Sequence, residues 1–175
     1  MSLLLVGIPA GISPHLVGRL RAQDDEVRAL LPEERAAEGW RALGAFVAVG
    51  PLDDADLVER AAQNVRTLVV GPDWEPKIAE VFVALIEGVR KAGVERIVLW
   101  GPKLDASFAE EIRLSGLSYV LLRGGKRRWL GSATLSGDRW SEAIDAADDL
   151  AGNVRLDLDL TTAAGWESLR LEPPL

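Results

Sequence analysis

The sequence predicts an α/β protein with a doubly wound, mostly parallel sheet covered by helices on both faces. Three observations carry this prediction. Short apolar segments alternate with amphipathic ones along the first 123 residues, and no repeat or low-complexity segment interrupts the series. Such alternation is typical of parallel strands joined by right-handed helical crossovers. The chain of 175 residues is long enough for one domain with a substantial core.

Hydrophobic periodicity places the elements in order. The clearest helix has apolar residues at i, i+3, i+4, i+7, i+8 and i+11 from Ile78, which form one buried stripe, and Gly93 ends it. The expected strands are 2–6, 26–30, 45–49, 66–70, 94–100 and 119–122. The expected helices are 14–22, 33–43, 54–63, 76–92 and 106–114.

The last fifty residues depart from this pattern. Residues 124–137 are basic and contain glycine, 140–150 form a helical pattern, and 154–160 alternate strictly between apolar and charged side chains. A period of two indicates a strand with one solvated face. We therefore expect an antiparallel strand at the C-terminal edge of the sheet, with residues 166–171 pairing beside it.

Composition excludes several classes of function. The formal charge of −7, from 27 acidic and 20 basic residues, argues against nucleic acid or an anionic membrane as the main partner. Without cysteine, and with His15 as the only histidine, we expect no metal site and no conventional catalytic triad. No apolar stretch reaches the ~20 residues that span a bilayer, and no signal-peptide pattern opens the chain, so we expect a cytoplasmic protein.

Five segments resemble motifs of one known family in their order and spacing. They are 26–30 (EVRAL), 41–45 (RALGA), 50–54 (GPLDD), 91–98 (KAGVERIV) and 115–119 (SGLSY). Together they resemble the atypical, NmrA-like branch of the extended short-chain dehydrogenase/reductase family, which is related to sugar epimerases. The resemblance implies a single NAD(P)-binding, Rossmann-like domain over residues 1–175, with 1–123 as its family-like core and 124–175 as a truncated C-terminal extension.

The family binds NAD or NADP with a Gly-x-x-Gly-x-x-Gly turn at a helix N-terminus. Gly7 matches the first glycine, whereas Ala10 and Ser13 replace the second and third, and Pro9 removes an amide donor. Ser13 before Pro14 also predicts a helix N-cap whose hydroxyl occupies a first-turn amide. The resemblance implies a weak or vestigial cofactor site formed by Gly7, Ala10, Gly11, Ile12, Ser13 and Gly71. We expect NAD or NADP to bind weakly or not at all.

Other cofactor and catalytic positions of the family also differ here. Glutamates follow the second strand (LPEE, 31–34) where an arginine often holds the 2′-phosphate of NADP, and Pro51 replaces an aspartate that contacts adenine. The family's Tyr-x-x-x-Lys pair transfers protons, but the only tyrosine is Tyr119, inside a predicted strand. Ungapped alignment puts Asp105 at an alternative lysine position, two residues from Lys103. We therefore assign no catalytic residue.

Some side chains have two interpretations. Trp74 and Trp100 follow the fourth and fifth strands, at the ligand-binding edge of such sheets, and either line an aromatic crevice or plug it. The basic cluster 126–128 binds a phosphate or acidic partner, or is a solvated loop. The acidic groups 53–56 and 145–149 are interpreted as helix caps and helix-surface charges.

Our leading functional hypothesis is a catalytically inactive module with a binding, regulatory or scaffold role and an unidentified protein partner. Only 52 residues follow Arg123, too few for the substrate lobe of extended members. One alternative is an NAD(P)-dependent oxidoreductase or epimerase-like enzyme with a displaced cofactor and Tyr119 or Lys103 as proton donor. Another is an NAD-sensing regulator. Because relatives commonly pair through helices 76–92 and 106–114, a homodimer is also expected.

Overall fold

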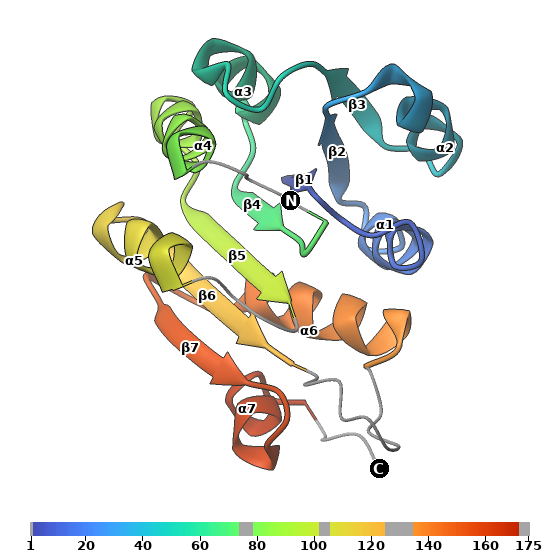
Figure 1. Ribbon diagram of the computed structural model, residues 1–175. Helices are drawn as coiled ribbons and strands as arrows, with labels where there is room; N and C mark the ends of the chain where they lie inside the picture. The colour runs from blue at the N-terminus through green and yellow to red at the C-terminus, as the bar shows by residue number, and fades with distance from the viewer. Residues whose placement is uncertain (1, 74–78, 102–105, 125–134, 172–175) are drawn as a thin grey trace, which may run out of the picture.

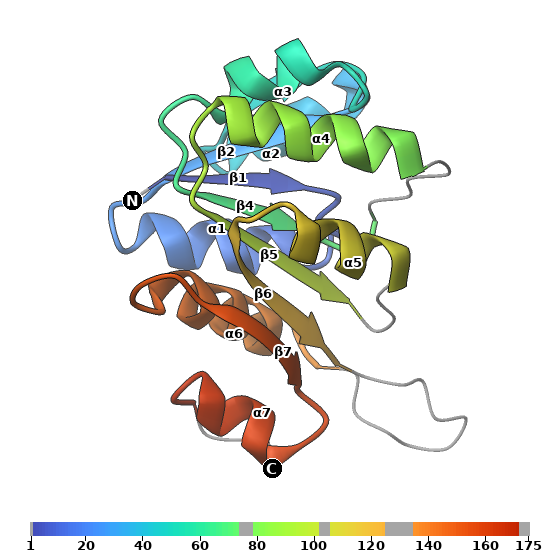
Figure 2. The same cartoon turned by 90° about the vertical axis from the view of Figure 1, so that its left-hand side faces the viewer.

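The computed structural model describes residues 2–73, 79–101, 106–124 and 135–171. Its sheet has seven strands in the order β3-β2-β1-β4-β5-β6-β7, and every pairing is parallel. Figure 2 shows the arrows of β1, β4, β5, β6 and β7 pointing the same way. The predicted α/β, Rossmann-like class is confirmed.

Almost every expected element is present. The strands are β1 (Ser2–Val6), β2 (Glu26–Leu31), β3 (Phe46–Val49), β4 (Thr67–Val70), β5 (Arg96–Gly101), β6 (Ser118–Arg123) and β7 (Arg155–Asp159). The helices are α1 (Ser13–Arg21), the 3₁₀ turn η1 (Glu34–Ala36), α2 (Ala37–Ala42), α3 (Ala55–Ala62), α4 (Ala79–Lys91), α5 (Ala106–Leu114), α6 (Gly137–Asp149) and α7 (Ala163–Ser168). The first three residues of the predicted helix 76–92 lie outside the described residues.

Two apolar cores cover the two faces of the sheet. Alternate β1 residues point to opposite sides, so that Leu3 and Leu5 join one cluster and Leu4 and Val6 join the other. Figure 1 shows α1 and α6 on one side of the sheet and α4 and α5 on the other. This double burial explains the nearly continuous apolar runs of the central strands.

The predicted antiparallel edge strand is wrong, because β7 runs parallel to β6, with Tyr119 opposite Arg155. The physical reason is α6, which carries the chain back across the sheet before β7 begins, as in every β-α-β unit. The alternating pattern instead reflects the edge position: Leu158 is buried, whereas Asp157 and Asp159 are exposed.

Residues 166–171 do not pair with β7 as we expected. Residues 163–168 form α7, which begins where the Thr162 hydroxyl accepts a hydrogen bond from the Gly165 amide. The indole of Trp166 is buried against the end of β7, and its Nε1 donates to the Leu160 carbonyl at 2.8 Å. A helix that buries a tryptophan therefore replaces the expected strand.

A buried polar network fixes the C-terminal end of α6 to the sheet. The Arg96 guanidinium donates to the carbonyls of Ala147, Leu150 and Gly152 at 3.0, 2.6 and 2.9 Å. The Asp148 carboxylate accepts from the Thr67 hydroxyl and lies 3.2 Å from Arg66 Nη2. Burial raises the pKa of Asp148 and lowers the pKa of Arg96.

The interpretation of residues 145–149 as surface charges is therefore wrong for two of them. Asp148 is 2% exposed, and Asp145 is buried where it accepts from Arg19 Nε at 2.7 Å and Gln23 Nε2 at 3.1 Å. These partners lie on α1 and at its C-terminal end, far from Asp145 in sequence. Asp54, by contrast, is confirmed as the N-cap of α3, where it accepts from the Asp56 and Leu57 amides. No helix of the described ranges is long and apolar enough to cross a bilayer.

Candidate functional site at the carboxyl edge of the sheet

Strand register places the candidate residues in one row. Val6 of β1 pairs with Val70 of β4, which pairs with Leu99 of β5. Gly7, Gly71 and Trp100 are the next residues along, so they follow one another across the carboxyl edge. Open α/β sheets bind their ligands in the crevice at this edge.

The two glycines bring the β1 and β4 turns into contact. Gly7 has a φ of +64°, a conformation that glycine adopts without strain, and its carbonyl accepts from the Asp73 amide at 2.9 Å. A Cβ on Gly71 would lie 2.5 Å from the Gly7 carbonyl oxygen. Both glycines are therefore required by the backbone itself, whether or not a ligand is bound.

The turn that follows uses some of its amides internally. Ile12 and Ser13 donate their N–H groups to the Pro9 carbonyl at 2.9 and 3.0 Å. These two bonds start the helix one residue earlier than the Ser-Pro signal predicts, with Ile12 at the cap. The predicted Ser13 N-cap is therefore wrong: Ser13 lies inside the first turn, and its hydroxyl donates to the Ala10 carbonyl at 3.3 Å.

The start of α1 is open. Among the described residues no side-chain cap hydrogen bond is present at its N-cap Ile12, although Asp54, Ser136 and Thr162 cap α3, α6 and α7. Ala10 and Gly11 are exposed, and a Cβ on Gly11 would meet no atom within 4 Å. An uncapped helix N-terminus carries partial positive charge and attracts anions. The turn can therefore receive a phosphate group, with fewer free amides than a turn of three glycines.

The start of α6 forms a wall beside this turn. A Cβ on Gly137 would lie 3.2 Å from the Gly11 carbonyl oxygen and 2.7 Å from His15 Cδ2. His15 Nδ1 lies 2.6 Å from a carboxylate oxygen of Asp138. The only histidine thus joins the starts of two helices.

Trp100 is packed within the core and is not an open wall of the crevice. It is 1% exposed, and its ring lies 4.6 Å from that of Trp140 on α6, tilted by 44°. Within the described residues, its Nε1 has no hydrogen-bond partner. Trp74, Lys103, Asp105 and the basic cluster 126–128 lie outside the described residues.

Tyr119 lies at the wrong edge of the sheet to serve the candidate site. It is the second residue of β6, at the amino end, whereas the candidate turn lies at the carboxyl edge. The four residues from Tyr119 to Arg123 span about 13 Å of strand. Its side chain is also buried in the core on the α4 and α5 side. The structure therefore contradicts Tyr119 as a proton donor at this site.

The end of β2 carries acidic side chains held in surface ion pairs. Glu33 lies 2.5 Å from Arg35 Nε, and Glu34 lies 2.6 Å from Arg41 Nη1. The hydrogen bond that the Arg41 guanidinium donates to the Glu34 carboxylate raises the pKa of Arg41. Acidic groups at this position of a dinucleotide fold favour a ribose hydroxyl over a 2′-phosphate.

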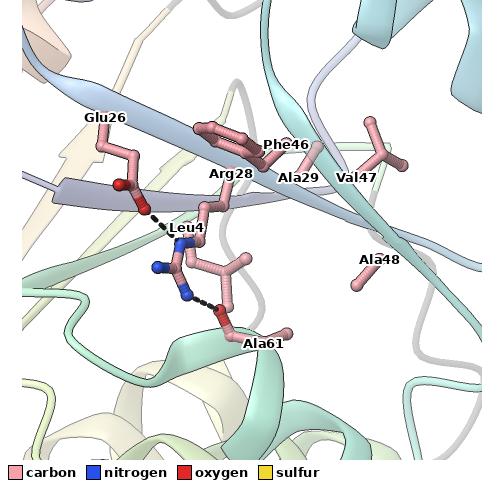
Figure 3. Close-up of a pocket in the computed structure, with 8 residues that line it drawn as sticks. All are labelled: Leu4, Glu26, Arg28, Ala29, Phe46, Val47, Ala48 and Ala61. Carbon is pink, nitrogen blue, oxygen red and sulfur yellow. Dashed lines mark hydrogen bonds and ion pairs between the residues drawn. The ribbon is translucent and has the colours of Figure 1, made fainter.

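Two cavities lie at the opposite, amino edge of the sheet. One, of about 280 Å³, lies over the first halves of β1, β2 and β3 and is drawn in Figure 3. The other, of about 450 Å³, is polar and lies beside Arg66, Arg96 and the end of α6. Sequence reasoning predicted neither. In the part of the chain that the structure describes, no group of three or more His, Asp or Glu side chains could hold a metal ion.

Comparison with known proteins identifies the fold. The sequence matches no protein-family model and no curated protein sequence. Its structure resembles ChuY, an anaerobillin reductase from Escherichia coli O157:H7, with a TM-score of 0.72 and 16% identity over 91% of this chain and 96% of that chain.

Two further structures were solved with a nicotinamide cofactor. The NADPH-dependent quinone oxidoreductase QOR2 of E. coli, complexed with NADPH, gives a TM-score of 0.73 and 17% identity over 89% of this chain and 67% of that one. The Citrobacter sp. triphenylmethane reductase, complexed with NADP(H), gives a TM-score of 0.71 and 14% identity over 90% of this chain and 69% of that one. The chain therefore has the Rossmann-type fold found in NAD(P)-binding reductases.

Proposed function

We propose that this chain is a nicotinamide-dinucleotide-binding module that holds the pyrophosphate of NAD weakly at the turn between β1 and α1. The open start of α1 carries the proposal. Gly11 is exposed beside an uncapped helix N-terminus, in the position where this fold accepts a pyrophosphate. Binding is weak because Ile12 and Ser13 already donate to the Pro9 carbonyl.

NAD is the preferred dinucleotide in this proposal. Glu33 and Glu34 follow β2 and are ion-paired with Arg35 and Arg41, so a 2′-phosphate would have to displace a carboxylate from its arginine, whereas a ribose hydroxyl can donate to a carboxylate that keeps its ion pair. The proposed role is binding or regulation without carbonyl reduction, because Tyr119, the only tyrosine, lies at the opposite edge of the sheet.

Two aspartate substitutions in α1 and its turn test the binding site. Gly11→Asp places a carboxylate beside the proposed pyrophosphate, and Gly18→Asp places the same charge farther along α1. Both positions are exposed, and a Cβ at either meets no atom within 4 Å. Calorimetric titration of the wild type with NADH should give a Kd between about 10 µM and 1 mM. Gly11→Asp should weaken binding at least about tenfold by charge repulsion, and Gly18→Asp should leave it nearly unchanged.

Two results would overturn the binding proposal. One is no heat of binding with millimolar NADH, and the other is equal weakening by the two aspartates. Tighter binding of NADPH than of NADH would refute the proposed preference for NAD but would leave the binding site in place.

A second candidate is reduction of a conjugated acceptor by NADH. It is favoured by the match to ChuY, which covers 96% of that chain. ChuY is named as a reductase, so a protein of this fold can be a reductase although almost none of its chain lies outside the matched region. Hydride addition to a quinone leaves an anion that is delocalised over the ring, and hydride addition to a cationic dye leaves a neutral product. Both acceptors therefore depend less on a proton donor such as tyrosine. The assay is the loss of NADH absorbance in the presence of a quinone or a triphenylmethane dye. A loss that Gly11→Asp abolishes and Gly18→Asp retains would establish this activity, as opposed to binding without reaction.

A further inference from the structure

The edge strand β3 is unusually apolar for an exposed edge. It consists of Phe46, Val47, Ala48 and Val49, without a charged residue or proline. In the described residues no strand pairs with its outer side. The Phe46 side chain is 65% exposed. Natural proteins usually protect such edges with charges, proline or covering segments, because a bare apolar edge pairs with other strands.

The free edge presents peptide groups of known direction. Gly50 donates its N–H to the Leu31 carbonyl of β2 at 3.0 Å. In a parallel ladder every second residue directs its own N–H and carbonyl to the same neighbouring strand. The N–H and carbonyl groups of Ala48 and Phe46 therefore also point toward β2. Val47 therefore directs its N–H and its carbonyl outward.

A cavity beside Phe46 continues this apolar surface. Leu4, Arg28 and Phe46 are in register across three strands and form part of its floor. The Arg28 guanidinium is held by Glu26 at 2.6 Å and by the Ala61 carbonyl, at the end of α3, at 3.2 Å (Figure 3). The cavity of about 280 Å³ is thus bounded by the end of α3 and opens beside the edge strand.

We propose that β3 pairs with β3 of a second copy of this chain, antiparallel and with the two-fold axis at Val47. The two Val47 residues then exchange both hydrogen bonds, as their outward peptide groups allow. This register puts Phe46 directly opposite the partner's Ala48 on the same face of the joined sheet. Each phenyl ring covers a small residue and the cavity beside it, so the surface is complementary to itself.

Charges at the two ends of β3 suit the same arrangement. Arg21 donates to the Gly44 carbonyl at 2.6 Å, which places a guanidinium at the amino end of the strand. The exposed Asp53 follows its carboxyl end. Antiparallel pairing brings each amino end beside the partner's carboxyl end, so that the positive end of one strand lies next to the negative end of the other. A four-residue strand buries less area than the ~1,200 Å² of a stable interface, and association is therefore weak.

Sedimentation velocity tests this proposal across protein concentrations from about 10 µM to 1 mM. The wild type should shift from a mass near 18.9 kDa toward twice that value as the concentration rises. Val47→Pro deletes the outward N–H and leaves the β2 ladder intact, so it should remain monomeric, whereas Val47→Thr should associate like the wild type. Phe46→Lys should also remain monomeric, and because Phe46 is mostly exposed this variant should keep the stability of the fold.

Three outcomes would overturn the proposed dimer. The wild type could remain monomeric up to about 1 mM. Phe46→Lys could associate as strongly as the wild type. Association could instead be abolished by Leu114→Glu on α5, which would place the interface on the helices.

Discussion

Two buried tryptophans differ in the hydrogen bonding of their indole N–H groups. Trp100 and Trp166 are each 1% exposed. Trp166 Nε1 donates to the Leu160 carbonyl at 2.8 Å, whereas Trp100 Nε1 has no partner among the described residues. Substituting phenylalanine at each position removes the same ring atoms and the same N–H group, so the cost of lost volume is similar in the two variants.

The hydrogen bond of Trp166 makes the two substitutions differ in their effect on stability. Trp166→Phe leaves the Leu160 carbonyl buried without a donor, which costs about 1–3 kcal/mol beyond the lost volume. Trp100→Phe deletes a donor that has no partner among the described residues and regains about 1–3 kcal/mol, which offsets its lost volume. Trp166 also lies under the Arg139 guanidinium, 4.4 Å from its ring centroid, and phenylalanine binds a cation less strongly.

We therefore expect Trp166→Phe to be less stable than Trp100→Phe by about 2–6 kcal/mol. For a chain of this size the corresponding difference in Tm is roughly 4–24 °C. Urea unfolding followed by far-UV circular dichroism measures both free energies without relying on tryptophan fluorescence. Equal losses of stability in the two variants would refute the assignment of Trp100 Nε1 as an unpaired donor.

Three other predictions test the packing and the charges. Arg96→Leu should lower the free energy of unfolding by about 3–5 kcal/mol, because buried carbonyls at the end of α6 lose their donor, whereas the surface variant Arg113→Leu should shift the urea midpoint much less. Burial raises the pKa of Asp148 above 3.8, so the native state holds this proton more tightly than the unfolded state. The stability of the wild type relative to Asp148→Asn should then fall as the pH rises above about 3.8, and a relative gain would contradict the sign. Leu114 is 71% exposed on α5, away from the proposed interface at β3, so Leu114→Glu should leave the mass measured by light scattering unchanged, and a lower mass would place the interface on the helices.

The fold could be predicted because double burial leaves a strong mark on the sequence. A strand covered on both faces, such as β1 or β4, is almost wholly apolar. In the helices between the strands, apolar residues recur every three to four positions. The direction of β7 left no such mark. Its alternation reports only that one face is solvated, which is equally true of a parallel strand at an edge. The preceding helix α6 was the better guide, because a helical crossover requires parallel strands.

The candidate site was less predictable, because local signals do not report contacts between distant residues. Ser13 followed by Pro14 is a strong N-cap signal, but the Pro9 carbonyl accepts two amides and moves the start of the helix. Arg96 and Asp148 are 52 residues apart, and nothing in either segment shows that they meet beneath α6. Polar residues at the starts of β4 and β5 were the available clue, since the amino ends of buried strands seldom carry charges without partners.

The position of α6 gives the C-terminal segment a direct relation to the candidate site. Asp145 and Asp138 both contact α1, through Arg19 and His15, and Gly137 lies against the turn that would receive a pyrophosphate. Through these contacts, a displacement of the start of α1 would be transmitted to the start of α6. The helix α6, which follows β6, thus packs against α1 and against the turn that forms the candidate site. Because the opposite end of α6 is fixed by Arg96, any such displacement should be largest at its N-terminal end.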